Sequence, residues 1–205
     1  MIKILGISGS PRREATEYAV QAALAAAKAF DDRIETQYIS FKGKKILPCC
    51  HCNACVRKKD GRCVLHDDLD DVLQSFLEAD GYLIGSPVYT YCPTPQIIAM
   101  FNRMRPWRMC FPSDLMIGRV GGAIAVGATR NGGQEITIQI IHNMLLAREI
   151  LVVGGSSGYY TGGTIWNQNK DAQGAAEDEI GLPSVEDIGR RVARYALMLR
   201  DSSGK

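Results

Sequence analysis

The stretch that decides the fold is residues 2–12, which read IKILGISGSPR. Its apolar first half predicts a short buried strand, and the glycine, serine and proline that follow end that strand. Residues 14–30 are rich in alanine and carry apolar side chains at helical spacing, so they predict a helix. This order of strand, short loop and helix is typical of the start of a parallel α/β sheet.

The same alternation continues along the chain. Further strands are predicted at residues 33–39, 82–86, 120–126 and 150–153, and further helices at residues 67–79, 95–104, 134–148 and 184–199. Ser184 and Asp187 form an imperfect capping box at the start of the last helix. Five strands joined by helices imply right-handed crossovers and a doubly wound, five-stranded parallel sheet with helices on both faces, which is a flavodoxin-like α/β fold.

No internal repeat or linker interrupts this pattern, so we expect a single domain over residues 1–205. Residues 42–66 have no clean periodicity and are interpreted as a loop inserted after the second strand. Residues 167–181 are polar and weakly patterned, and we expect an excursion or an oligomer contact there.

Composition excludes several classes of protein. The chain has 46% hydrophobic residues, enough for one core, and a net charge of +2, which argues against nucleic-acid binding. No stretch has the roughly 18 apolar residues of a membrane helix, so no membrane partner is expected. The first residues begin a strand rather than a signal peptide, so a cytoplasmic location is expected, where stable disulfides are rare.

Three loops follow the carboxyl ends of predicted strands, and such ends bind ligands in doubly wound sheets. Residues 8–12 offer hydroxyls and amides at a helix start, which suit a monophosphate although the loop is neither a Walker loop nor GxGxxG. In the second loop, Tyr89 and Tyr91 could hold a flat ring, and the glycines of residues 127–133 allow close approach of a ligand. Each loop alone also fits ordinary packing, but their agreement at one edge favours a ligand site.

Five of the seven cysteines lie between Cys49 and Cys63, and four of them follow the pattern C-x2-C-x2-C-x7-C. These four predicted metal ligands are Cys49, Cys52, Cys55 and Cys63. Thiolates suit iron–sulfur clusters and zinc, and structural zinc more often uses two separated C-x2-C pairs, so the spacing favours a [4Fe–4S] cluster with zinc as the alternative. Cys50 is then spare, and His51 and His66 are expected outside the ligand set.

Basic and aromatic residues follow the predicted helix at residues 95–104. Arg103, Arg105, Trp107 and Arg108 are interpreted as a solvated helix end, where cations are favoured. The alternatives are a docking patch for an acidic partner or a contact with the phosphate of a ligand bound to a neighbouring subunit. Cys92 is expected to be a packing residue, and Cys110 to lie in the core or an interface.

Taken together, these motifs resemble a known family. GISGSPR at residues 6–12, GSPVY at 85–89 and RNGGQE at 130–135 look like the three FMN loops of the NADPH-dependent FMN reductase superfamily. With the cysteines added, the chain resembles the iron-sulfur flavoproteins of anaerobic microbes, from residue 2 to about residue 155.

The resemblance implies that the first loop holds the FMN phosphate, the second holds the isoalloxazine ring and the third borders that ring. The residues implied are Ser8, Ser10, Pro11, Arg12 and Thr16 in the first loop, Ser86, Pro87, Val88 and Tyr89 in the second, and Thr129, Arg130, Asn131 and Gly132 in the third. In one departure, residues 13–16 read REAT where the family often has an Asn-Thr pair, so Glu14 stands near the expected phosphate.

We therefore expect a flavin-dependent oxidoreductase that holds FMN and a [4Fe–4S] cluster and relays electrons from a reduced carrier such as ferredoxin to an acceptor. No acid–base dyad is expected. The resemblance also implies a homo-oligomer, a dimer or tetramer, in which the cluster of one subunit lies near the FMN of another.

Three alternatives stay open. One is an NAD(P)H-dependent FMN, quinone or metal-ion reductase with zinc or no metal at the cysteines. Another is a non-catalytic binding module braced by zinc. The third is a thiol redox sensor that uses Cys50 and Cys92.

Overall fold

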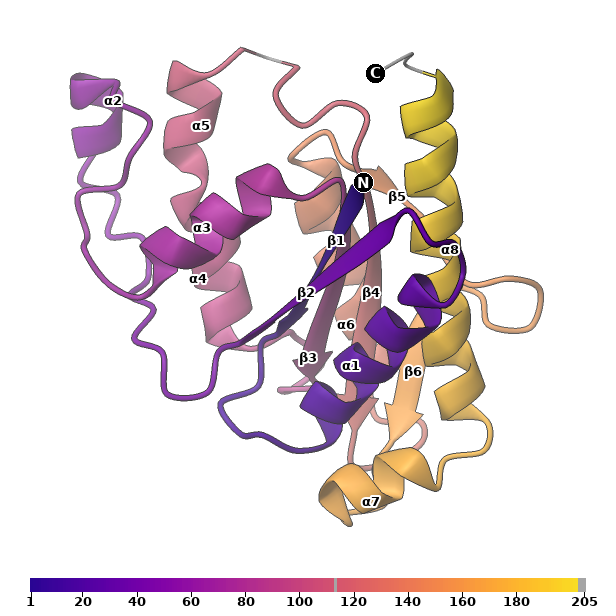
Figure 1. Cartoon of the computed structure of the whole chain (residues 1–205). Coiled ribbons are helices and arrows are strands. Elements are labelled where there is room, and N and C mark those ends of the chain that lie inside the picture. Colours follow the sequence, from indigo (N-terminus) through magenta and orange to yellow (C-terminus); the bar gives the residue numbers. More distant parts are fainter. Residues whose placement is uncertain (113, 203–205) are drawn as a thin grey trace.

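The computed structural model describes residues 1–112 and 114–202 as a parallel sheet covered by helices on both faces (Figure 1). The strands are β1 (Ile2–Ser8), β2 (Ile34–Ser40), β3 (Gly81–Pro87), β4 (Val120–Gly127), β5 (Leu151–Val152) and β6 (Gly163–Trp166). Their order is β2-β1-β3-β4-β5, and every pairing between them is parallel. The predicted flavodoxin-like, doubly wound sheet is confirmed.

The fifth position of the sheet is shared by two short strands. β5 pairs with the start of β4, at Val120 and Gly121, whereas β6 pairs with its end, from Ile124 to Gly127. The chain between them, residues 153–162, leaves the sheet as a loop. The predicted strand at residues 150–153 is thus only the first half of a strand that this excursion splits.

The helices on one face are α1 (Ala15–Lys28) and α8 (Gly181–Ser202), and those on the other are α3 (Leu69–Glu78), α4 (Pro95–Arg103) and α6 (Gln134–Leu146). Successive strand side chains alternate between the two cores, as the pleat requires. Ile4 packs with α1 and α8, and the next residue, Leu5, packs with α3, α4 and α6. The short helices are α2 (Ala54–Lys58), α5 (Arg105–Cys110) and α7 (Asp171–Ala176).

The start of the last helix differs from the predicted capping box. α8 begins at Gly181, so Ser184 lies within its first turn. The Ser184 hydroxyl donates to the Gly181 carbonyl at 2.6 Å and accepts from the Thr164 amide at 3.0 Å. The carboxylate of Asp178 accepts a hydrogen bond from the Gly181 amide at 3.0 Å. The capping box was therefore wrong, because Asp178 bonds the first amide of the helix while Ser184 ties the helix to β6.

The end of α4 and the residues after it do not form the solvated helix end that the sequence suggested. Arg103 is 1% exposed and Trp107 is 6% exposed, while Arg108 lies on the surface. The prediction was wrong for Arg103 and Trp107, because a buried carboxylate elsewhere in the chain pairs with Arg103 and Trp107 packs against Phe76. In the part of the chain that the structure describes, no helix combines the length and the apolar character needed to cross a membrane.

The packing of α8 on α1 generates a prediction about stability. A Cβ atom at Gly189 would overlap the backbone oxygen of Ala23, which cannot move away as a flexible side chain would. We expect Gly189→Ala to lower the free energy of unfolding by about 1–3 kcal/mol, as overpacked cores do. Urea unfolding followed by circular dichroism measures this change. The control is Met198→Ala on the same helix, where the side chain is 57% exposed, and equal stabilities of the two variants would contradict the prediction.

Candidate functional site

A pocket lies at the carboxyl edge of the sheet, where the three predicted loops meet. Its lining residues are Ser10, Arg12, Glu14, Ala15, Thr16, Pro87, Val88, Tyr89, Val126, Ala128 and Asn167. Six of the thirteen residues expected to bind the cofactor line it, namely Ser10, Arg12, Thr16, Pro87, Val88 and Tyr89. Asn167 follows β6, and sequence reasoning missed it because β6 itself was not predicted.

The first loop leaves hydrogen-bond donors available at the start of α1. None of the described side chains caps this helix, so the amides of its first turn are available to an anion. The Ser10 hydroxyl accepts a hydrogen bond from the Arg12 amide at 3.1 Å, which shapes the loop. Ser8 is fully buried and its hydroxyl has no hydrogen-bond partner among the described residues. Glu14 forms an ion pair with Arg12 at 3.0 Å, so its charge is compensated beside the pocket.

The second loop is a tight two-residue turn. Thr90 and Tyr91 both adopt left-handed backbone angles, with φ of 49° and 64°. Tyr89 and Cys92 exchange backbone hydrogen bonds of 2.8 and 2.9 Å across the turn. This geometry leaves Tyr89 and Tyr91 about half exposed at the pocket edge. Cys92 is also exposed, so the expectation that it packs inside was wrong.

Thr94 joins the first and second loops. Its hydroxyl donates to the Gly9 carbonyl at 2.8 Å, and its amide donates to the Ser86 hydroxyl at 2.9 Å. Ser86 in turn donates to the Pro87 carbonyl at 2.8 Å. The structure thus places the Ser86 hydroxyl inside the loop, in bonds that fix its shape.

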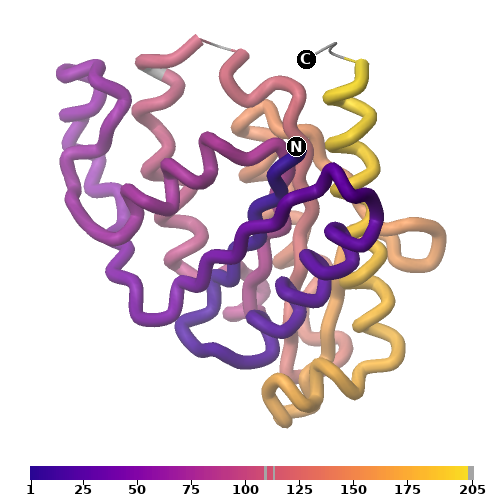
Figure 2. Tube along the Cα trace, in the orientation of Figure 1, coloured from indigo at the N-terminus to yellow at the C-terminus, as the bar shows by residue number. Residues whose placement is uncertain are grey.

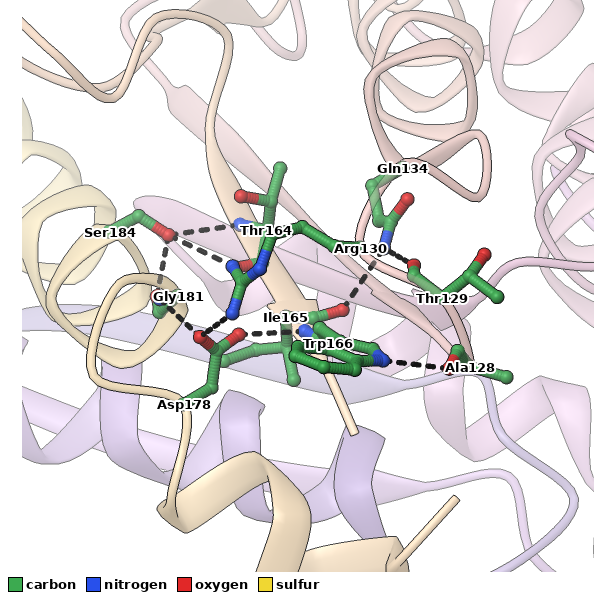
Figure 3. A network of polar contacts seen from close by, with 10 residues as sticks. All are labelled: Ala128, Thr129, Arg130, Gln134, Thr164, Ile165, Trp166, Asp178, Gly181 and Ser184. Carbon is green, nitrogen blue, oxygen red and sulfur yellow. Dashed lines mark hydrogen bonds and ion pairs between the residues drawn. The ribbon is translucent and has the colours of Figure 1, made fainter. Parts of the chain in front are cut away.

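The third loop is held from the side by a polar network (Figure 3). The Arg130 guanidinium lies 4.9 Å from the ring centroid of Trp166 and donates to the Asp178 carboxylate at 2.7 Å. Trp166 donates from its indole to the Ala128 carbonyl at 2.8 Å. The residues Thr129, Arg130 and Asn131 are exposed and lie outside the pocket lining. Trp166 and Asp178 were missed because no local pattern links them to a loop so distant in sequence.

Asp178 is the acceptor that connects the other members of this network. Its side chain is fully buried and accepts hydrogen bonds from the Trp166 amide at 2.8 Å and the Gly181 amide at 3.0 Å, besides Arg130. Burial by itself raises the pKa of Asp178, but these amides and the guanidinium outweigh it and hold the pKa below its ordinary value.

The cysteines form a second pocket in the long segment between β2 and α3. Its lining includes the four predicted ligands Cys49, Cys52, Cys55 and Cys63, together with Cys50, His51 and Arg105. Cys49 and Cys52 are exposed, and Cys55 and Cys63 are half-buried. Left-handed backbone angles at His51, Asn53 and Lys59 turn the chain around α2. The Ala54 amide, which donates to the thiol, is the main cause that lowers the pKa of Cys52.

The donor set of this second pocket fits a thiolate-bound metal group. Four thiols share one pocket, and thiolates are the ligands of iron–sulfur clusters and of zinc. Within residues 1–112 and 114–202, no three His, Cys, Asp or Glu side chains are grouped closely enough to hold a metal ion as they stand. His66, with 85% of its side chain exposed, lies outside this pocket.

The two pockets share no lining residue and are built from different parts of the chain. The cysteine segment leaves the carboxyl end of β2, as expected from the sequence, but then runs back along the sheet (Figure 2). α2 therefore lies beside α5, on the side of the molecule where the strands begin and far from α7 and the ends of β3 and β6 (Figure 1). The tip of the cysteine segment therefore lies away from the three loops at the carboxyl edge.

A five-position parallel sheet with three ligand loops at its carboxyl edge defines the flavodoxin-like class of proteins. Within that class, the chain belongs to the NADPH-dependent FMN reductase family, whose sequence model matches residues 2–161. Two iron-sulfur flavoproteins of Methanocaldococcus jannaschii are similar to it along their whole length. They are 43% and 40% identical over 204 and 202 residues, which cover 99% and 97% of this chain and 100% of each relative.

Solved structures agree on the fold. RosB, with a bound flavin-related intermediate, superposes with a TM-score of 0.77 at 14% identity, covering 98% of this chain and 81% of RosB. A WrbA-like flavodoxin from Agrobacterium tumefaciens gives a TM-score of 0.65 at 18% identity, covering 97% of this chain and 99% of the other. Family and fold together make this chain a flavin-dependent oxidoreductase.

The network around Asp178 generates a prediction with a defined pH dependence. Asp178→Asn removes the buried negative charge that accepts hydrogen bonds from Arg130 and from the amides of Trp166 and Gly181. The substitution is expected to lower the free energy of unfolding at pH 7 by about 1–3 kcal/mol. Because the folded-state pKa is below the ordinary value of 3.8, the stabilisation is full above that pH and is lost as pH falls through the folded pKa. The difference between wild type and variant should therefore shrink on acidification from pH 7 to pH 3.

Urea unfolding at several pH values measures this difference. The control is Glu177→Gln, the adjacent acid whose side chain is 43% exposed in a surface pair with Lys170. It should change stability by less than about 0.5 kcal/mol. A constant difference between wild type and Asp178→Asn at every pH would contradict the linkage.

Proposed function

We propose that this protein is an electron-transfer flavoprotein that holds FMN at the carboxyl edge of the sheet and a [4Fe–4S] cluster on Cys49, Cys52, Cys55 and Cys63. It would relay electrons from a reduced carrier such as ferredoxin to an acceptor. The observation that carries the proposal is the second pocket, in which four cysteines of the expected spacing come together in a chain of the FMN reductase family.

The first pocket supports the placement of FMN. The free amides of α1, with Ser10, Arg12 and Thr16, would hold the phosphate. The buried hydroxyl of Ser8, at the carboxyl end of β1, has no hydrogen-bond partner among the described residues. The segment Pro87 to Tyr89 would lie against the isoalloxazine ring. The exposed face of the Tyr89–Cys92 turn then limits which acceptors reach that ring.

The cysteine pocket supports a cluster over a bare structural ion. Three of the cysteines come from the short stretch up to and including α2 and the fourth from the return of the same segment, so the thiols would surround a compact group. Flavin exchanges electrons singly or in pairs, and a cluster exchanges them one at a time, which is the chemistry the two groups would supply. Lys42, Lys44, Lys45, Arg57, Lys58 and Lys59 lie in the same segment and would offset the negative charge of the thiolates.

The positions of the two pockets support a homo-oligomer. The tip of the cysteine segment at α2 lies far from the carboxyl ends of β3 and β6, so a cluster held there would be poorly placed for transfer to the flavin of the same subunit (Figure 1). A cluster on the surface of one subunit would instead lie against the flavin edge of a second subunit. The exposed thiols of Cys49 and Cys52 suit this arrangement, because a neighbouring subunit would cover them.

The second candidate function is an NADPH-dependent flavin reductase, which the description of the matching family favours. It uses the same first pocket and needs no metal at the cysteines. The two functions differ in the donor that reduces the flavin.

The cofactor content tests the proposed cluster. Protein purified without oxygen should show flavin bands over a broad brown absorbance, with iron near about four per chain and no stoichiometric zinc. We expect Cys52→Ser to lose the iron and keep the flavin, because the two pockets are separate. The matched control is Cys50→Ser, a neighbouring thiol outside the expected ligand set, which should keep both. Yellow wild-type protein that holds zinc and no iron would refute the cluster.

The choice of donor tests the relay. In anaerobic stopped-flow experiments, reduced ferredoxin should bleach the flavin of the wild type quickly and that of Cys52→Ser at least roughly tenfold more slowly, since the entry point for single electrons is lost. Dithionite should reduce the flavin of both proteins, which serves as the control. Reduction by NADPH that is equally fast in both proteins, with no response to ferredoxin, would establish the reductase function instead.

A further inference from the structure

Arg103 is a fully buried arginine that neither pocket accounts for. It is the last residue of α4, and its side chain has 0% exposure. Charged side chains are rarely enclosed in this way, because removal from water is unfavourable unless partners replace the lost hydration. The partners of Arg103 therefore indicate its role.

The Arg103 guanidinium joins the two ends of the cysteine segment. Its Nη1 donates to the Leu47 carbonyl at 3.3 Å, and its Nη2 donates to the Leu65 carbonyl at 2.6 Å. Leu47 stands two residues before Cys49, and Leu65 stands two residues after Cys63. One planar group thus closes the base of the loop that carries all four predicted ligands.

Asp67 completes this closure. Its carboxylate, also fully buried, pairs with Arg103 Nη1 and accepts hydrogen bonds from the Leu47 amide at 2.7 Å and the Leu69 amide at 3.1 Å. The segment that enters the loop and the segment that leaves it are thereby fixed to each other and to the start of α3. Such closure lowers the conformational entropy that the loop must lose when its thiols gather.

Arg103 also lies beside one of the thiols. Arg103 and Cys63 line the same pocket, and a guanidinium keeps its positive charge in proteins. The third nitrogen of the guanidinium, Nε, is buried and has no hydrogen-bond partner among the described residues. A fixed positive charge with an unused donor therefore stands next to Cys63.

We propose that Arg103 is the positioning residue of the cysteine centre: it closes the base of the loop that carries the four thiols, which limits the conformations from which they must gather around a metal, and it places a positive charge beside Cys63. The inference rests on the proposed cluster for its second part only. A positive charge near a thiolate-bound cluster favours the reduced, more negative state, so it raises the reduction potential.

Two substitutions of Arg103 distinguish its role in loop closure from its role as a positive charge. Arg103→Lys keeps a charge but has no planar fork to reach both carbonyls, and Arg103→Met keeps volume but has neither property. The matched control is Arg108→Met, a surface arginine on the neighbouring α5. Flavin uptake at the distant first pocket and circular dichroism show whether each variant is folded.

Loop closure is measured on reduced, metal-free protein. Alkylation by iodoacetamide, followed residue by residue with mass spectrometry, should become roughly tenfold faster at the half-buried Cys55 and Cys63 in both Arg103 variants, because local opening exposes them. Cys92, exposed in the Tyr89–Cys92 turn, is the internal standard and should not change. Rates in folded Arg103→Met equal to those of the wild type and of Arg108→Met would overturn the closure.

The charge is measured on protein loaded with iron and sulfide. The midpoint potential of the metal centre should shift to more negative values in Arg103→Met, and less so in Arg103→Lys, while Arg108→Met stays near the wild type. An unchanged potential in Arg103→Met would overturn the electrostatic role. Wild-type protein that forms no cluster would refute the proposed function, whereas the alkylation pattern would still support or refute the closure.

Discussion

The arrangement of both pockets depends on one nine-residue helix that is fixed at both ends. At its start, the Thr94 hydroxyl and amide bond to Gly9 and Ser86, so the helix is tied to the first and second loops. At its end, Arg103 bonds to the base of the cysteine loop. At the usual rise of about 1.5 Å per residue, α4 is a rigid spacer of roughly 13 Å. Each pocket is therefore shaped by contacts at one end of the same helix.

Both sites use the same device, a buried carboxylate that joins a functional loop to the scaffold. Asp178 bonds to Arg130 and two backbone amides, and Asp67 bonds to Arg103 and two backbone amides. A buried ion pair alone gives little net stability, because desolvation offsets the attraction between the charges. The additional amide bonds satisfy the remaining lone pairs, so each pair holds a loop in one conformation.

Much of the fold follows from local sequence. Apolar runs such as residues 2–8 have the length and composition of buried strands, and alternation with helices is enough to predict the parallel sheet. β6 was missed because its four residues carry only one fully buried aliphatic side chain, Ile165, between threonine and tryptophan. The burial of Arg103 was missed because its carboxylate partner is 36 residues away, and no local periodicity reports such a pair.

The sequence predicts which loops and which cysteines form the candidate sites, but it does not predict the path of the cysteine loop. In a parallel sheet the carboxyl ends of the strands meet at one edge, so the three loops follow from the order of strands and helices in the sequence. The cysteine spacing is a local sequence pattern and can be read directly. The path of the cysteine loop is not local, because it is set by Arg103 and Asp67 rather than by the residues of the loop. That path carries the thiols away from the strand ends where the loop begins (Figure 2).

This separation has a consequence for how electrons would move. In the arrangement that we propose, electrons pass between two copies of the chain related by symmetry, with the cysteine segment of one copy against the three loops of the other. The near-balanced charge of +2 opposes such contact only weakly, since copies of this chain repel one another little. An Arg103–Asp67 pair that holds the cysteine loop at the molecular surface would then determine both the ligand geometry and the contact with the second copy.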